Sequence, residues 1–133
     1  MELTYKTIVD IAEGVDNLYK RNYSNARQTD KVAQILNQAR EAQANFVEIR
    51  KRYLEENAPN GISIDPQTDP DLFREAQKYM RSLLDDTVEI IGNPCVSFGD
   101  LEKFEKKNKA ITACEMSALR ALGILDDGEA AEG

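Results

Sequence analysis

The feature that most constrains the fold of this chain is an apolar seam between Thr29 and Asn57. Its spacing alternates between three and four residues, which places every member on one side of a helix and does not fit a strand. Thr29 is a candidate N-cap, and no Gly or Pro interrupts the segment before Pro59. The spacing therefore predicts one helix of about 29 residues and roughly 43 Å. The seam consists of Val32, Ile35, Ala39, Ala42, Phe46, Ile49 and Tyr53.

A helix of that length needs cover along its apolar side, and two arrangements would supply it. Other helices of the same chain can lie on the seam, or a second copy can pair with it as a coiled coil and form a homodimer. Ala39 and Ala42 at the centre of the seam permit a close approach in either arrangement.

Two further amphipathic helices flank the long one. The first begins after Thr4 as N-cap and continues to about Tyr19, and we expect its Gly14 to pack closely against the long helix. The short linker 22–26 predicts that these two helices form an antiparallel hairpin. The third helix begins at Pro70 after Asp69 and continues to about Leu84, and we expect its apolar face to be core and to complete a three-helix layer. That face consists of Leu72, Phe73, Ala76, Tyr79, Met80, Leu83 and Leu84.

The remaining segments predict small strands and a C-terminal helix pair. Segments 87–91 and 95–98 flank Gly92-Asn93-Pro94 and read as a β-hairpin, with 62–64 as a candidate third strand. A short helix is expected over Asp100–Asn108, and the pattern Thr112-x-x-Glu115 is a capping box that opens a last helix ending at Gly123.

Together these elements predict a mainly α fold. We expect an antiparallel hairpin with one long central helix, a third helix, a small β-hairpin and a short C-terminal helix pair. Residues 1–125 would form a single domain, and 126–133 would form an acidic disordered tail.

Charge argues against direct binding to nucleic acid. The net charge is −7, and residues 1–60 are balanced, so the whole deficit lies in residues 61–133. We interpret two groups of basic residues as solvated faces with acidic partners one turn away. One group lies near Tyr19 and Tyr23, and the other is the run Arg50-Lys51-Arg52 beside Tyr53. An acidic surface that imitates nucleic acid is the open alternative.

No pattern in the sequence predicts catalysis, a cofactor or a metal site. The chain has no His, no glycine-rich phosphate loop and no paired Cys motif. The acidic residues of 100–105 alternate with Lys, as in an exposed helix with ion pairs. Cys95 and Cys114 are expected to be buried or half-buried free thiols. No apolar run is long enough to cross a bilayer, and the first residues lack the features of a secretory signal, so we expect a cytoplasmic protein.

The chain resembles a family of small proteins of unknown function from tailed bacteriophages and prophages. The resemblance covers about residues 3–122 and rests on the long helix ending Ile49-Arg50-Lys51-Arg52-Tyr53, on 83–90 with its Val88-Glu89-Ile90 strand, and on 111–116 with the capping box. It implies a phage context, in the cytoplasm of a bacterial host or in the virion, and supplies no functional residues.

The sequence therefore predicts a non-enzymatic phage protein that binds another protein, in the virion or during its assembly. The alternative is a small acidic inhibitor of a host factor or defence protein, and an enzyme of unrecognised type is a third hypothesis. The candidate interaction residues are Val32, Ile35, Ala39, Ala42, Phe46, Ile49, Arg50, Arg52 and Tyr53.

Overall fold

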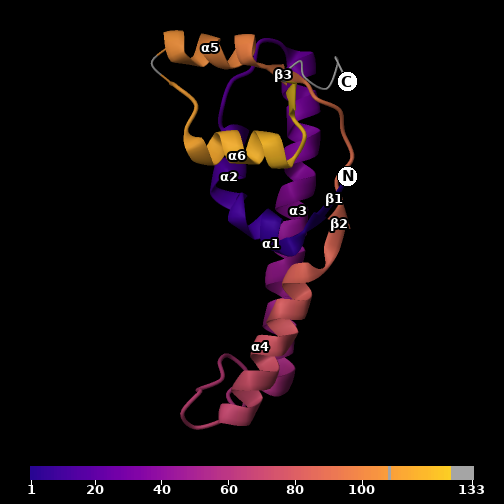
Figure 1. The fold of residues 1–133 in the computed structure, drawn as a ribbon, viewed down its shortest axis with the longest axis vertical. Coiled ribbons are helices and arrows are strands. Elements are labelled where there is room, and N and C mark those ends of the chain that lie inside the picture. Colours follow the sequence, from indigo (N-terminus) through magenta and orange to yellow (C-terminus); the bar gives the residue numbers. More distant parts are fainter. Residues whose placement is uncertain (108, 127–133) are drawn as a thin grey trace.

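The computed structural model describes residues 1–107 and 109–126 and shows a mainly helical molecule organised around one long helix (Figure 1). The predicted fold class is confirmed. In chain order the elements are β1 (Glu2–Thr4), α1 (Tyr5–Asp10), α2 (Ala12–Tyr19), α3 (Ala26–Asn57), α4 (Pro70–Asp85), β2 (Thr87–Glu89), β3 (Val96–Ser97), α5 (Phe98–Lys106), α6 (Ala113–Ala121) and β4 (Leu125–Asp126).

Helix α3 has 32 residues, which corresponds to about 48 Å. It ends at Asn57 as predicted but begins three residues earlier than Thr29, because Asn25 is the N-cap. The Asn25 side chain accepts a hydrogen bond of 2.9 Å from the Gln28 backbone N–H. The Thr29 hydroxyl lies within the first turn and donates to the Asn25 carbonyl at 2.9 Å.

The core of the molecule forms where α1 and α2 cover the first half of α3. Thr4 is the predicted N-cap of α1, and its hydroxyl accepts from the Thr7 N–H at 3.2 Å. Helix α6 packs on the other side of α2, and α5 closes the end of the molecule where α3 begins (Figure 1). Among the fully buried side chains are Ile8, Val15, Leu18, Val32, Leu36, Val96, Leu119 and Ile124.

Gly14 makes a close approach as predicted, but its partner is α6 and not the long helix. A Cβ at Gly14 would overlap the Cys114 carbonyl and lie 3.0 Å from the Cβ of Ala118. The glycine therefore lets the backbones of α2 and α6 touch, and this contact brings the C-terminal helix into the core.

Strands β2 and β3 lie close to their predicted positions, but each pairs with a strand that was not predicted, β1 or β4. Strand β2 pairs antiparallel with the N-terminal β1, with Leu3 opposite Val88, and β3 pairs in parallel with β4, with Val96 opposite Leu125. The predicted hairpin 87–98 does not form, because the side-chain amide of Gln38 occupies both backbone groups of Ile91, at 2.7 and 2.8 Å. The chain then runs past α3 instead of turning back.

The predicted third strand at 62–64 is also absent from the described part of the chain. The Asn60 side chain accepts hydrogen bonds from the backbone N–H groups of Ile62 and Ser63, at 2.9 and 2.8 Å. These bonds hold the segment as a turn, since the donors that a strand would use are already engaged.

Both C-terminal helices begin with a capping box. Ser97 and Asp100 form one at the start of α5, two residues before the predicted start, and Thr112 and Glu115 form the predicted one at α6. Asp126 pairs with Ser97 in β4, although it was predicted to belong to the disordered tail. Asn108 and residues 127–133, on which the end of the predicted helix and the predicted disorder fall, lie outside the described residues.

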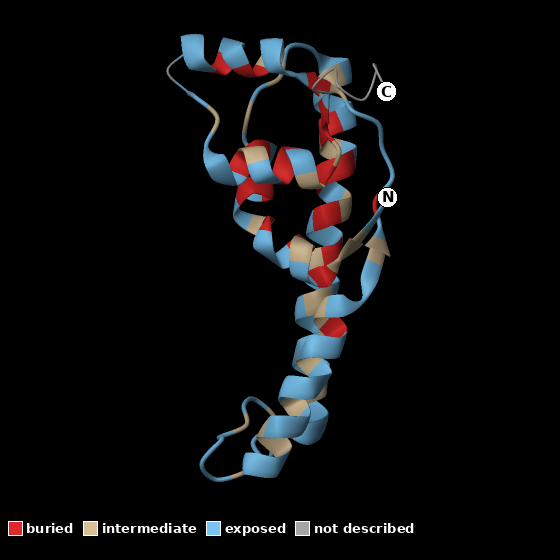
Figure 2. Ribbon diagram, in the orientation of Figure 1, coloured by how far each residue is buried: buried red, intermediate tan, exposed pale blue. Residues whose placement is uncertain are grey.

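Helix α4 has nearly its predicted bounds, but most of its apolar face is not core. Only Leu83 is buried, and Tyr79 is exposed. The predicted three-helix layer does not form. The buried residues of α3 end at Ala42, α1 reaches only as far as Phe46, and farther along α3 the ring of Tyr53 contacts Tyr79 of α4. Residues 47–82, which we call the arm, thus form a two-helix projection with few buried residues (Figure 2).

Candidate functional site: a groove in the arm

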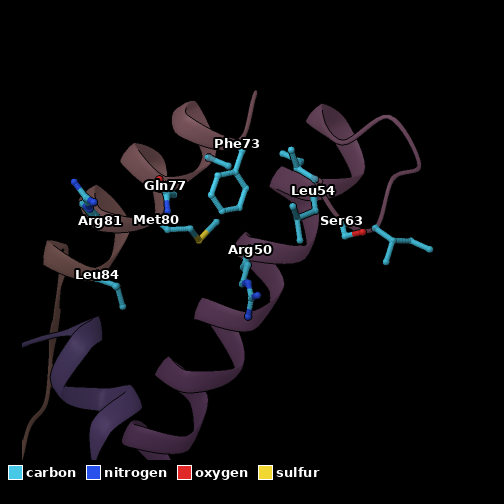
Figure 3. A pocket seen from close by; sticks show the side chains of 11 residues that line it. Arg50, Leu54, Ser63, Phe73, Gln77, Met80, Arg81 and Leu84 are labelled. Carbon is cyan, nitrogen blue, oxygen red and sulfur yellow. The ribbon is translucent and has the colours of Figure 1, made fainter. Parts of the chain in front are cut away.

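A groove of about 410 Å³ runs along the arm between α3 and α4 (Figure 3). Its apolar lining comes from both helices and from the loop that joins them, and the side chains of this lining are half-buried or exposed. A half-covered apolar surface of this kind, away from the core, is typical of a binding site. The lining residues are Arg50, Leu54, Ile62, Ser63, Ile64, Phe73, Ala76, Gln77, Met80, Arg81 and Leu84.

An aromatic pair joins the two helices of the arm. The rings of Tyr53 on α3 and Tyr79 on α4 stack with centroids 4.2 Å apart and planes 12° apart. Two rings between the helices keep the backbones apart, so the smaller side chains of the groove do not meet across it. The pair therefore both holds the arm together and leaves the groove open.

The loop 58–69 closes one end of the groove. Ala58 is buried and caps α3, and Gly61 takes a φ of 72°, which allows the chain to turn sharply at that point. Beyond the turn, Ile64 is half-buried, whereas Ile62 is 75% exposed. The loop thus contributes an apolar wall that is not itself covered.

The groove carries positive charge on both of its helices. Arg50 lies on α3 and Arg81 on α4, and neither forms an ion pair with any other residue that the structure describes. By contrast, two neighbouring arginines form ion pairs within the chain: Arg52 with Glu48 at 3.4 Å, and Arg74 with Asp71. Arg50 and Arg81 are therefore available to an acidic ligand.

The structure divides the predicted interaction residues into three groups. Val32, Ile35, Ala39 and Ala42 are buried in the core of this chain, which leaves them unavailable to a partner. Phe46, Ile49 and Tyr53 are half-buried, and the Phe46 ring lies 5.7 Å from that of Tyr5. Of the two predicted arginines, Arg50 lines the groove and Arg52 does not.

The apolar residues of α4 that line the groove were predicted as core. Their pattern shows that a face is apolar but does not show what covers it. The signal that could have identified them is length, because α1 and α2 together have 14 residues and cannot cover the 32 residues of α3. The remainder of α3 had to pair with α4 alone.

An ion-pair cluster that was not predicted from the sequence links the segment just after α2 to α6. The Arg21 guanidinium pairs with Glu115, donates to the carbonyls of Lys109 and Ala110 at 2.6 and 3.0 Å, and lies over the Phe104 ring. Burial disfavours the Glu115 carboxylate, but hydrogen bonds from Arg21 and Thr112 outweigh burial and lower its pKa below the ordinary value. Each of these groups has an internal partner, so the cluster serves the fold rather than a ligand.

The two cysteines offer no reactive site. Both are free thiols, as predicted, with Cys95 half-buried but Cys114 exposed, contrary to the prediction of burial. Burial raises the pKa of the Cys95 thiol, which disfavours the reactive thiolate. Among the described residues, no three His, Cys, Asp or Glu side chains lie together in a way that could hold a metal ion, and no helix is long and apolar enough to cross a membrane.

Comparisons of the chain with models of protein families, with curated proteins and with solved structures found no match. The groove itself is therefore the basis for the functional argument.

Proposed function

We propose that this chain is a non-catalytic protein-interaction module and that the groove in the arm is its docking surface. The observation that carries the proposal is the half-buried apolar lining of the groove, which no element of the described chain covers. Covering apolar surface with a partner would remove it from water at about 25 cal/mol per Å². A partner that covered the groove would therefore gain free energy by burying its apolar lining.

The position of the groove supports the same proposal. Because α3 is continuous, it joins the arm to the core without a hinge loop, and the arm projects from the body of the molecule (Figure 1). A partner can therefore approach the groove from the sides of the arm without meeting α5 or α6.

The resemblance to bacteriophage proteins suggests the class of partner to test first. On that basis we propose that the partner is a phage structural protein and that the module acts in the virion or in its assembly. The alternative role, as an inhibitor of a host protein, would use the same surface and differs only in the identity of the partner.

Site-specific crosslinking in the cell that naturally expresses the chain tests this proposal. A photoreactive amino acid at Gln77, which lines the groove, should capture one defined protein, whereas the same group at Lys78 should not. Ala76→Arg places a large charged side chain in the groove and should abolish the capture. Ser82→Arg, at an exposed position of the same helix that does not line the groove, is the matched control and should leave it intact.

The identity of the captured protein decides between the two roles. A capsid, portal or tail protein would support a part in assembly, and a host nuclease or nucleic-acid-binding protein would support inhibition. Equal capture from Gln77 and Lys78, or capture that survives Ala76→Arg, would refute the groove as the docking surface.

A further inference from the structure

The length and pattern of the groove fit a helix. On α4 the lining positions 73, 76, 77, 80, 81 and 84 follow the three- and four-residue steps of one helical stripe, and they span about 16 Å. A ligand helix of about 11 residues, or three turns, would match that length. Laid between α3 and α4, it would complete the three-helix layer that the chain leaves unfinished.

An extended peptide would fit this surface less well. Both long walls of the groove are helices, whose backbone groups are satisfied within each helix, so they offer side chains alone. A bound strand would have no sheet edge to pair with, and its own N–H and C=O groups would lose water without gaining partners. A helix brings its backbone hydrogen bonds with it.

The positive charge of the groove favours ligand helices with acidic residues over those with basic residues. Arg50 on α3 and Arg81 on α4 line the groove from different helices, with the Arg81 side chain at the outer edge of α4 (Figure 3). Neither forms an ion pair with a residue in the described part of the chain. A ligand that buried the apolar floor would also bring its flanking residues close to these guanidinium groups. Carboxylates at those flanks would form charge-assisted hydrogen bonds, and ammonium groups would be repelled.

We infer that the groove binds an amphipathic helix of a partner protein with Asp or Glu at the edges of its apolar face. This inference rests on the proposed function and specifies the chemistry of the ligand. It predicts selectivity that a purely apolar groove would not have.

A displayed library of helical peptides, selected on the full chain, tests the inference. Peptides of about 14 residues would carry fixed apolar positions at helical spacing and randomised flanking positions, with the Ala76→Arg variant used to remove peptides that bind elsewhere. The recovered peptides should be enriched in Asp and Glu at the flanks. Their affinity should fall about tenfold in the double variant R50E/R81E, which should instead prefer peptides with Lys at the same positions.

The matched control is the double variant K78E/K106E, which makes the same change in net charge at exposed positions outside the groove. Its circular dichroism and that of R50E/R81E should equal that of the original chain, and its peptide affinity should be unchanged. A similar loss in both variants would overturn the inference, because it would show a response to net charge alone.

The other outcomes separate this inference from the proposed function. Apolar peptides without an acidic bias, or Pro-rich extended peptides, would overturn the acidic helix and leave the groove as a docking surface. Self-association through the groove, or no enrichment against Ala76→Arg, would overturn the inference, and the crosslinking from Gln77 would then decide the proposed function by itself.

Discussion

At the scale of single residues, Glu115 links local capping to tertiary structure. It is the one charged side chain in the buried class among the described residues, with 2% of its surface exposed. Its carboxylate accepts hydrogen bonds from Thr112 at the start of α6 and from Arg21, two residues after the end of α2. One side chain therefore fixes both the first turn of a helix and the packing of that helix on another.

The charge of Glu115 should make stability depend on pH. Glu115→Gln leaves Arg21 without its counter-charge, and we expect a loss of about 3 kcal/mol in the free energy of unfolding at pH 7. Because the folded-state pKa lies below the ordinary value of 4.5, the stabilisation is fully present above that value and is lost as the pH falls through the folded pKa. The difference between the original chain and the variant should therefore shrink in urea unfolding below about pH 4.

Glu102→Gln provides the control for this experiment, because Glu102 is exposed on α5. That change should alter the free energy of unfolding by less than about 0.5 kcal/mol. A difference between the original chain and Glu115→Gln that stays constant from pH 7 to pH 3 would contradict the role of the carboxylate charge.

At the scale of elements, the arm depends on few contacts of its own. Tyr53 and Tyr79 stack between α3 and α4, whereas the residues of α4 that reach the core lie near its C-terminal end, at Leu83. Elements with little buried apolar surface open with low free energies. The arm is therefore the part of the described chain that we expect to open first.

A double-mutant cycle measures the contribution of the aromatic pair. Tyr53→Ala and Tyr79→Ala should couple by about 1 kcal/mol, and each should speed hydrogen exchange of the α4 amides while the α2 amides stay protected. Tyr19→Ala is the control, since Tyr19 is 46% exposed and its contact, the Arg40 guanidinium over its ring, lies outside the arm. Additive effects of the two substitutions would show that the stacked rings contribute no coupling.

The elements also show how far sequence reasoning extends. Three helix ends, at Thr4, Asn57 and Thr112, followed from caps and punctuating residues that act locally. The starts of α3 and α5 were predicted three and two residues too late, because Asn25 and Ser97 are the actual N-caps. Strand partners did not follow, because β1 and β2 are more than 80 residues apart and the Gln38 amide displaces the expected hairpin. For the groove, Arg50 was a candidate interaction residue from the basic run beside Tyr53. The α4 face was assigned to the core, because an apolar pattern does not show which elements of the whole fold cover it.

At the scale of the whole molecule, the seam is covered within one chain. Its first half lies under α1 and α2, and its second half faces α4 through Tyr53 and Tyr79. This packing leaves no continuous apolar stripe on α3 for a second copy. The intramolecular arrangement therefore accounts for the seam without a coiled-coil dimer.

We accordingly expect the urea midpoint of unfolding to be independent of protein concentration. A dimer held together through α3 would gain stability with concentration by mass action, and a hundredfold range would shift its free energy of unfolding by about 2.7 kcal/mol. Measurement across that range, with sedimentation velocity at both ends, distinguishes the two states. A urea midpoint that rises with protein concentration would instead support a homodimer.

Because α3 is continuous, its length sets both the distance and the orientation of the groove relative to the core. Each residue of α3 between the core and Arg50 adds about 1.5 Å of reach and about 100° of rotation to the groove. Inserting one residue into α3 and one into α4 would thus rotate the groove away from its present direction relative to the core. Inserting seven residues into each helix would nearly restore the original direction and would place the groove about 10 Å farther from the core. The length of α3 therefore determines both the distance and the direction of the groove.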